Sequence, residues 1–224
     1  FSTMVSAVRE GRRIYDNIRK FVLFLLRANF DEILLITTVL ALDMPLPYLP
    51  IHILWINLMT DGLPALALGV EKAEPDIMKR PPRPTKEGIL TGEIGRLVIA
   101  SSTGFIYSFG LFLFLKGKYG FETTENIEHV RSVMLMMAIT FELLLVHTVR
   151  SKKPLWQIGF FTNKWLLAAT IVPFLLQFLI VYSPLSVLFH LQPLSVFDWT
   201  IALGLAFSSF LVFELMKFLP DKWF

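Results

Sequence analysis

The chain has 224 residues, of which 54% are apolar, and its mean hydropathy is +0.61, a composition typical of an integral membrane protein. The 21 Lys and Arg and the 18 Asp and Glu cluster between the apolar runs, so the net charge of +3 reports on membrane orientation and not on nucleic-acid binding. The chain has no cysteine, which excludes disulfides and thiolate metal sites.

The first twenty residues are polar and basic, with five Lys or Arg. Apolar residues from Ile14 to Leu25 recur at helical spacing. Residues 1–20 are therefore expected to form a connector helix that runs straight into a first membrane span over residues 21–42.

Five further apolar runs follow, separated by loops that are rich in proline or charge. A bilayer is crossed by roughly 20 apolar residues in a helix, which is the length of these runs. The predicted spans cover residues 49–70, 97–115, 130–149, 165–182 and 199–219. The sequence thus predicts an all-α membrane protein whose residues 21–224 form a six-span transmembrane domain.

The distribution of basic residues predicts the orientation of these spans. The side shared by the two termini carries 17 Lys and Arg, and the opposite side carries 3. Because cytoplasmic loops are enriched in Lys and Arg, both termini are expected to be cytoplasmic. The protein is therefore expected to be an integral, multi-pass protein of the lipid bilayer.

The second span carries polar residues at its centre. A charge at the bilayer midplane costs at least about 2.5–3.5 kcal/mol, so Asp61 is a functional-site candidate by default. Pro64 cannot donate to the carbonyl of Thr60, and Gly62 adds backbone freedom. We expect the helix to be broken at Gly62/Pro64, a recurrent design in cation sites. The alternative is a kinked helix whose Asp61 is merely paired with a neighbour.

Three carboxylates fall at a similar depth on different spans. With a helical rise of about 1.5 Å per residue, Glu32, Asp61 and Glu142 lie roughly 10–17 Å from the cytoplasmic face. Such carboxylates repel one another unless a cation or protons bind between them. Hard oxygen ligands suit Ca²⁺, Na⁺ or H⁺ better than zinc or copper. The alternative is a set of unrelated polar residues that hydrogen-bond across helices.

Two more charges accompany this group on the first span. Arg27 and Asp31 are four residues apart, a spacing that permits an ion pair within a helix. Such a pair would either neutralise charge in a buried pocket or contribute to selectivity. Arg27 alone would act as a built-in cation that weakens one ion site, so both residues are expected to be modulating.

Several motifs resemble those of one family. Residues 1–12 (FSTMVSAVREGR) resemble the segment that joins the phosphorylation domain of P-type ATPases to their fifth membrane helix. Residues 57–65 (NLMTDGLPA), followed by Ala67-Leu68-Gly69, resemble the sixth helix of type II calcium pumps, and residues 76–83 resemble the loop after it. The resemblance covers the whole chain, more weakly toward its end, and implies that the six spans are membrane helices five to ten.

The resemblance also implies a function and a set of ion ligands. The positions that match the calcium-pump ligands are Asn29, Glu32, Asn57, Thr60, Asp61 and Glu142. A second ion site would further need a Glu and backbone carbonyls from helix four, which this chain lacks. Arg27 and Asp31 depart from the calcium-pump pattern, where small residues are usual.

The family phosphorylates an Asp in Asp-Lys-Thr-Gly, and the sequence contains neither this tetrapeptide nor a Walker motif. ATP and Mg²⁺ are therefore expected to act only through cytoplasmic domains in the N-terminal half of a longer pump, and this chain alone should be inactive. The sequence leaves two alternatives to a Ca²⁺ pump. One is an H⁺ or Na⁺ pump of the same family, and the other is a stand-alone, non-enzymatic ion-binding or assembly module.

Overall fold

The computed structural model describes residues 1–84 and 88–218, and within these ranges all regular structure is helical. The elements are α1 (Ser2–Ala41), α2 (Pro50–Trp55), the π-helix η1 (Ile56–Gly62), α3 (Leu63–Gly69), α4 (Ile94–Tyr119), α5 (Thr124–Thr148), α6 (Leu155–Ile158), the 3₁₀-helix η2 (Phe160–Thr162), α7 (Lys164–Val181), α8 (Leu185–Leu188) and α9 (Val196–Met216). The all-α prediction is confirmed for these residues.

Five helices in the described part of the chain are long and apolar enough to cross a membrane. They are the continuous segment Pro50–Gly69 and the helices α4, α5, α7 and α9, which correspond to predicted spans two to six. The predicted end of the last span, Leu219, lies outside the described residues. The second half of α1 carries Arg27, Asp31 and Glu32, so its place in the membrane stays a prediction.

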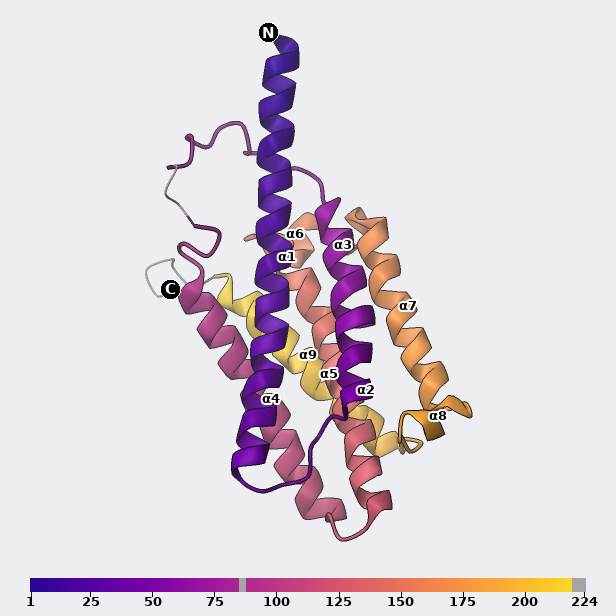
Figure 1. The fold of residues 1–224 in the computed structure, drawn as a ribbon. Coiled ribbons are helices and arrows are strands. Elements are labelled where there is room, and N and C mark those ends of the chain that lie inside the picture. The colour runs from indigo at the N-terminus through magenta and orange to yellow at the C-terminus, as the bar shows by residue number, and fades with distance from the viewer. Residues whose placement is uncertain (85–87, 219–224) are drawn as a thin grey trace.

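The connector and the predicted first span form one uninterrupted helix of 40 residues, as expected. Figure 1 shows the N-terminal part of α1 extending beyond the rest of the bundle. The second half of α1 packs against α3 and α4. A single rigid element therefore joins the exposed N-terminal end to the interior of the bundle.

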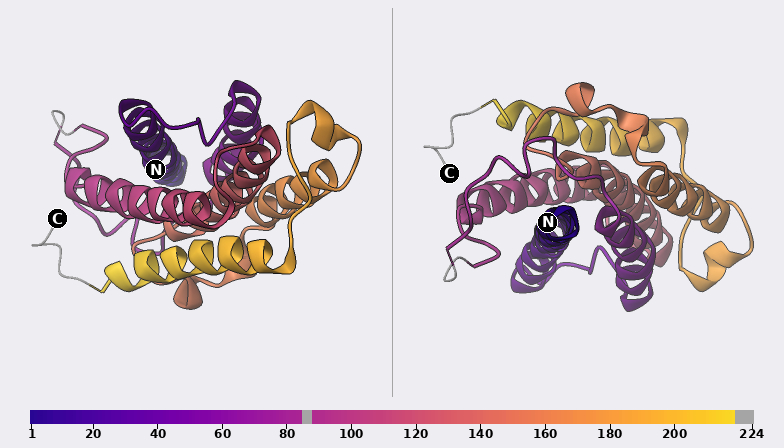
Figure 2. Two further views of the ribbon diagram at one scale, coloured as in Figure 1. Left: turned by 90° about the horizontal axis from the view of Figure 1, so that it is seen from below. Right: turned by 90° about the horizontal axis from the view of Figure 1, so that it is seen from above.

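Helix α5 lies at the centre of the bundle. It contacts α4, α7 and α9, and more weakly α1 and α3, and Figure 2 shows it between α1 and α3 on one side and α9 on the other. In its most apolar stretch 83% of the residues are buried, against 28–39% in the other candidate spans. Buried Met134, Met136 and Met137 fill this core, where the flexible thioether side chain adapts to irregular gaps.

The helix is not opened at Gly62 and Pro64. The backbone torsions of Gly62 (φ −62°, ψ −51°) and Leu63 (φ −64°, ψ −47°) are α-helical, and Ile56–Gly62 forms a π-helix. The ring of Pro64 crowds the carbonyl four residues before it, and the wider π-turn accommodates this ring without breaking the helix. The predicted break with freed carbonyls is therefore replaced by a π-helical segment.

The loop after α3 is bound to the first half of α1. Arg12 Nη1 donates hydrogen bonds to the carbonyl oxygens of Ile77 and Arg80, both at 2.8 Å. The Asp16 carboxylate accepts from Arg80 Nη1 at 2.8 Å and from Arg83 Nη2 at 2.6 Å. The connector helix and this loop therefore form one structural unit.

A buried polar junction, formed by Asn17, Glu71, Arg150 and Asn163, joins α1, α3, α5 and α7. Arg150 binds Glu71 through two hydrogen bonds, Nε to Oε2 at 3.0 Å and Nη2 to Oε1 at 3.1 Å. Asn163 Nδ2 donates to Glu71 Oε2 at 2.8 Å, and Asn17 Nδ2 donates to the Glu71 carbonyl at 2.9 Å. The Arg150 side chain is almost fully buried, so the junction depends on this complete set of partners.

The ion pair in this junction predicts a pH dependence of stability. Burial raises the pKa of Glu71, but the hydrogen bonds from Arg150 and Asn163 outweigh burial and leave the pKa below its ordinary value of 4.5. A lowered pKa means that the charged pair stabilises the fold fully above that value and loses this contribution as the pH falls below it. We expect the melting temperature of the intact protein to fall more steeply below about pH 4.5 than that of Glu71→Gln. A constant difference between the two proteins across this range would contradict the expectation.

Candidate cation site

The predicted site residues come from three elements that meet inside the bundle. Asn29 and Glu32 lie on α1, Thr60 and Asp61 lie on the π-helix η1, and Glu142 lies on α5. Glu32, Asp61 and Glu142 are 8%, 2% and 3% exposed, so all three carboxylates are buried. The π-helical turn places Thr60 and Asp61 together on the buried side of η1.

Two hydrogen bonds between helices connect these residues. Asn29 Nδ2 donates to Asp61 Oδ2 at 3.2 Å, and Thr60 Oγ1 donates to Glu142 Oε2 at 2.6 Å. The residues that make each bond are 32 and 82 positions apart in the sequence, so only the tertiary fold brings them together. Predicted residues of all three elements therefore contribute to one buried group, in which the charges of Glu32, Asp61 and Glu142 act on one another.

Two of the carboxylate oxygens in this group are fully buried and have no hydrogen-bond donor within the described residues. Glu32 Oε1 and Asp61 Oδ1 are buried and accept from no group in the described part of the chain. A buried charged oxygen without a partner is costly, and a cation or a proton removes that cost. The two oxygens are therefore the positions where a hard cation gains most by binding.

The carboxylates do not form a compact metal cluster by themselves. In residues 1–84 and 88–218, no group of three or more His, Asp or Glu side chains is close enough to hold a metal ion. A bound cation would therefore need neutral oxygens as well, and Asn29 and Thr60 supply an amide and a hydroxyl beside the two acidic groups.

Asn57 is not brought into this group. Its side chain is exposed, and its Nδ2 donates back to the Ile53 carbonyl of its own helix at 2.9 Å. The neighbouring Leu54 and Leu58 are 66% and 60% exposed, so Asn57 lies on an open face of the bundle.

Arg27 and Asp31 form no ion pair, which corrects the expectation from their spacing. Asp31 Oδ2 accepts from Ser108 Oγ on α4 at 3.3 Å, and a Cβ added to Gly104 would lie 2.9 Å from the Asp31 carboxylate. Asp31 therefore packs into a gap in α4 that the glycine leaves open. Arg27 lines a different cavity, together with Glu93 and other charged residues.

Tyr48 is a neighbour of the site that the sequence pattern did not indicate. It lies in the connection between α1 and α2, is 2% exposed, and is near the carboxylates of Asp31, Glu32 and Glu142. A buried tyrosine hydroxyl beside several carboxylates is a suitable polar neighbour for them. Its only sequence signal is an aromatic residue directly after the proline-containing turn.

A buried group of carboxylates, an amide and a hydroxyl between helices of membrane length is typical of ion-transporting membrane proteins. Residues 45–219 match the family described as "Cation transporting ATPase, C-terminus". The chain belongs to this family, and the resemblance to P-type ATPases that its motifs carry is confirmed.

Curated relatives agree with this assignment. The chain is 37% identical, over 92% of its length, to a calcium-transporting ATPase of Bacillus subtilis, and covers 23% of that protein. It is 34% identical, over 98% of its length, to an endoplasmic reticulum-type calcium-transporting ATPase of Arabidopsis thaliana, and covers 24% of it. It is 33% identical, over its full length, to a calcium-transporting ATPase of Listeria monocytogenes, and covers 25% of it. The chain thus spans about a quarter of each relative.

Proposed function

We propose that this chain is the ion-binding, C-terminal membrane half of an ATP-driven pump that transports Ca²⁺. The observation that carries the proposal is the buried group in which Asn29 contacts Asp61 and Thr60 contacts Glu142, with free carboxylate oxygens beside them. Ca²⁺ is bound in proteins by such oxygen ligands. The calcium-transporting ATPases among the relatives support this choice of ion.

The proposed topology places α1 in the membrane as a sixth span. Its second half packs along α3 and α4, and its charged Asp31 and Glu32 are buried against the bundle. The excess of Lys and Arg on one side supports cytoplasmic termini. Residues 1–20 then form a cytoplasmic connector, and residues 21–224 form the six-span domain in the bilayer.

In the proposed mechanism, the cation first meets the two oxygens that have no donor, Glu32 Oε1 and Asp61 Oδ1. Glu142 supplies further negative charge, and Asn29 and Thr60 supply neutral oxygens. Asn57 lies apart on the open face, where it would complete a second site with ligands from the N-terminal half of the pump.

The continuous α1 gives this mechanism a mechanical link. Asn29 and Glu32 sit on the same rigid helix as the exposed N-terminal end, about 40 Å away at about 1.5 Å per residue. A displacement of that end by phosphorylated cytoplasmic domains would move two ligands relative to Asp61. ATP and Mg²⁺ would act only in those domains.

Arg27 favours one alternative, an H⁺ or Na⁺ pump with the same architecture. It places a cation five residues before Glu32, and the same carboxylates are able to carry protons or Na⁺. A positive charge on the same helix opposes the binding of a divalent ion more than that of a monovalent one.

The experiment that tests the proposal is ATP hydrolysis by the intact parent protein in detergent, titrated separately with free Ca²⁺, Na⁺ and H⁺. We expect activation at about micromolar Ca²⁺, in the range of other regulated calcium sites. If ATP hydrolysis does not respond to Ca²⁺ but depends on Na⁺ or pH, the transported ion is Na⁺ or H⁺ and not Ca²⁺. No cation-stimulated hydrolysis in the intact protein would support a non-enzymatic module.

A further inference from the structure

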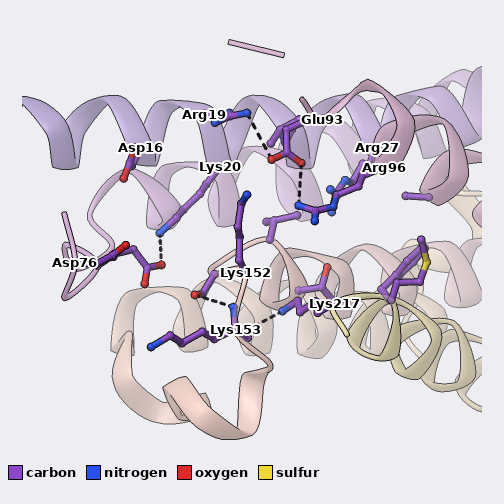
Figure 3. Close-up of a pocket in the computed structure, with 18 of the residues that line it drawn as sticks. Asp16, Arg19, Lys20, Arg27, Asp76, Glu93, Arg96, Lys152, Lys153 and Lys217 are labelled. Carbon is purple, nitrogen blue, oxygen red and sulfur yellow. Dashed lines mark hydrogen bonds and ion pairs between the residues drawn. The ribbon is translucent and has the colours of Figure 1, made fainter. Parts of the chain in front are cut away.

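A charged cavity lies at the end of the bundle where α4 begins and where α5 and α9 end (Figure 3). It has a volume of about 810 Å³ and is separate from the candidate cation site. Its walls come from α1, the loop before α4, the first turns of α4, residues 148–153 and the last turn of α9. The cavity therefore lies beside the ends of three helices of membrane length.

The lining of this cavity has a marked excess of positive charge. Nine of its side chains are Lys or Arg, and four are Asp or Glu. Each acidic side chain already has a basic partner at 2.8 to 3.5 Å. The remaining positive charge is thus not neutralised by the lining itself, and the cavity attracts anions.

The positive charge of Arg27 lies at the inner end of the cavity. Arg27 is seven residues, or about 10 Å, further along α1 than Lys20. Its buried Nε donates to no acceptor in the described part of the chain. The nearby Glu93 already pairs with Arg19 at 3.5 Å and Arg96 at 3.8 Å.

Three cations meet at this inner end, and one of them, Lys217, also pairs with Glu214 of α9 at 2.6 Å. Arg27 and Arg96 are close enough to repel one another, and Lys217 is close enough to Arg27 for the same effect. In Figure 3, Arg27 and Arg96 lie on one wall of the cavity, and Lys217 lies on the wall opposite. An anion between them would turn this mutual repulsion into attraction.

The cavity also has an apolar wall. Leu23, Ala100, Val149, Phe213 and Met216 contribute to the lining, and they sit near the ends of the predicted spans. A free phosphate ion gains no binding free energy from apolar side chains, whereas an acyl chain is stabilised by packing against them. Cations at the helix ends together with apolar side chains below them match a phospholipid.

We propose that this cavity binds the phosphate head group of an anionic phospholipid. Arg27, Arg96 and Lys217 bind the phosphate at the inner end, and exposed Lys152 and Lys153 attract it at the rim. The acyl chains leave along the apolar wall toward the bilayer. This site goes beyond cation transport and does not depend on which ion is transported.

The test uses the intact parent protein in detergent and follows its melting temperature as lipid is added. Phosphatidylglycerol, phosphatidylcholine of the same chain length, and inorganic phosphate are compared. A ligand that binds only the folded protein raises the melting temperature with concentration. We expect phosphatidylglycerol to raise it by several degrees and the other two to have little effect.

Variants of the lining test whether the lipid raises the melting temperature by binding in this cavity. The pair Lys152→Gln and Lys153→Gln removes two exposed rim charges and should raise the half-maximal lipid concentration about tenfold. Arg27→Gln should abolish the response. The matched control is Lys72→Gln with Lys79→Gln, which removes two exposed charges from the neighbouring loop outside the cavity. This control should respond as the wild type does.

Three results would overturn the proposal. One is equal protection by phosphatidylcholine, which would show a general lipid effect. The second is equal protection by inorganic phosphate, which would show an ion site and no lipid site. The third is an unchanged response in the Lys152 and Lys153 pair. These exposed side chains leave folding intact, so the pair decides the question even if Arg27→Gln does not fold.

Discussion

Asp61→Asn in the intact parent pump should lower the apparent affinity for Ca²⁺ in ATP hydrolysis by at least about 100-fold. Asn has the same shape as Asp but lacks its charge, and the charge of the ligand set tunes the affinity for Ca²⁺. Asp61 is buried, is fixed by Asn29 at 3.2 Å and has one oxygen without a donor. A 100-fold loss corresponds to about 2.7 kcal/mol of binding free energy.

Asp43→Asn is the matched control for this variant. Asp43 lies just after α1, is exposed and has a positive φ of 52°, which Asn tolerates as well as Asp does. This control should keep the Ca²⁺ dependence of the wild type. Unchanged Ca²⁺ activation in Asp61→Asn would show that Asp61 is a structural residue only.

Arg150→Gln should lower the stability of the membrane domain by about 3–5 kcal/mol, because it leaves the buried Glu71 carboxylate without its main partner. Arg150 also donates to the Gly159 carbonyl at 3.2 Å and to Thr162 Oγ1 at 2.6 Å, so several loops lose an anchor together. The measurement is thermal unfolding of the intact protein in detergent.

A double-mutant cycle separates this ion pair from other effects of the substitution. The variant with both Glu71→Gln and Arg150→Gln should lose less stability than the sum of the two single losses, because no unpaired charge remains buried. The control is Lys164→Gln, which removes an exposed charge at the start of α7 and should change stability by less than about 0.5 kcal/mol. Strictly additive losses would contradict the role assigned to the Glu71–Arg150 pair.

The helical architecture could be predicted because it depends on local patterns. Apolar runs of membrane length gave the spans within a few residues, and helical periodicity gave the unbroken connector of α1. The depth of polar residues along each span placed Glu32, Asp61 and Glu142 at a similar level, and all three are buried in the structure. The structure places Asn29 at Asp61 and Thr60 at Glu142, although their role as ligands stays a prediction.

The remaining features depend on partners that sequence spacing does not reveal. Arg27 and Asp31 have the spacing of an ion pair. Asp31 instead accepts a hydrogen bond from Ser108 and packs against Gly104, both on another helix. Whether Pro64 breaks a helix or widens its turn depends on the packing around it. Glu71 and Arg150 are 79 residues apart, so nothing in the local pattern connects them.

Equilibrium binding of radioactive Ca²⁺ to the intact parent protein, without ATP, tests the central claim most directly, because it does not depend on turnover. Wild type and Glu32→Gln are compared at fixed pH, since Glu32 Oε1 is one of the two buried oxygens without a donor. We expect binding at about micromolar Ca²⁺ in the wild type and loss of this binding in Glu32→Gln. Equal binding in two equally well-folded proteins would show that Ca²⁺ does not bind between α1, η1 and α5.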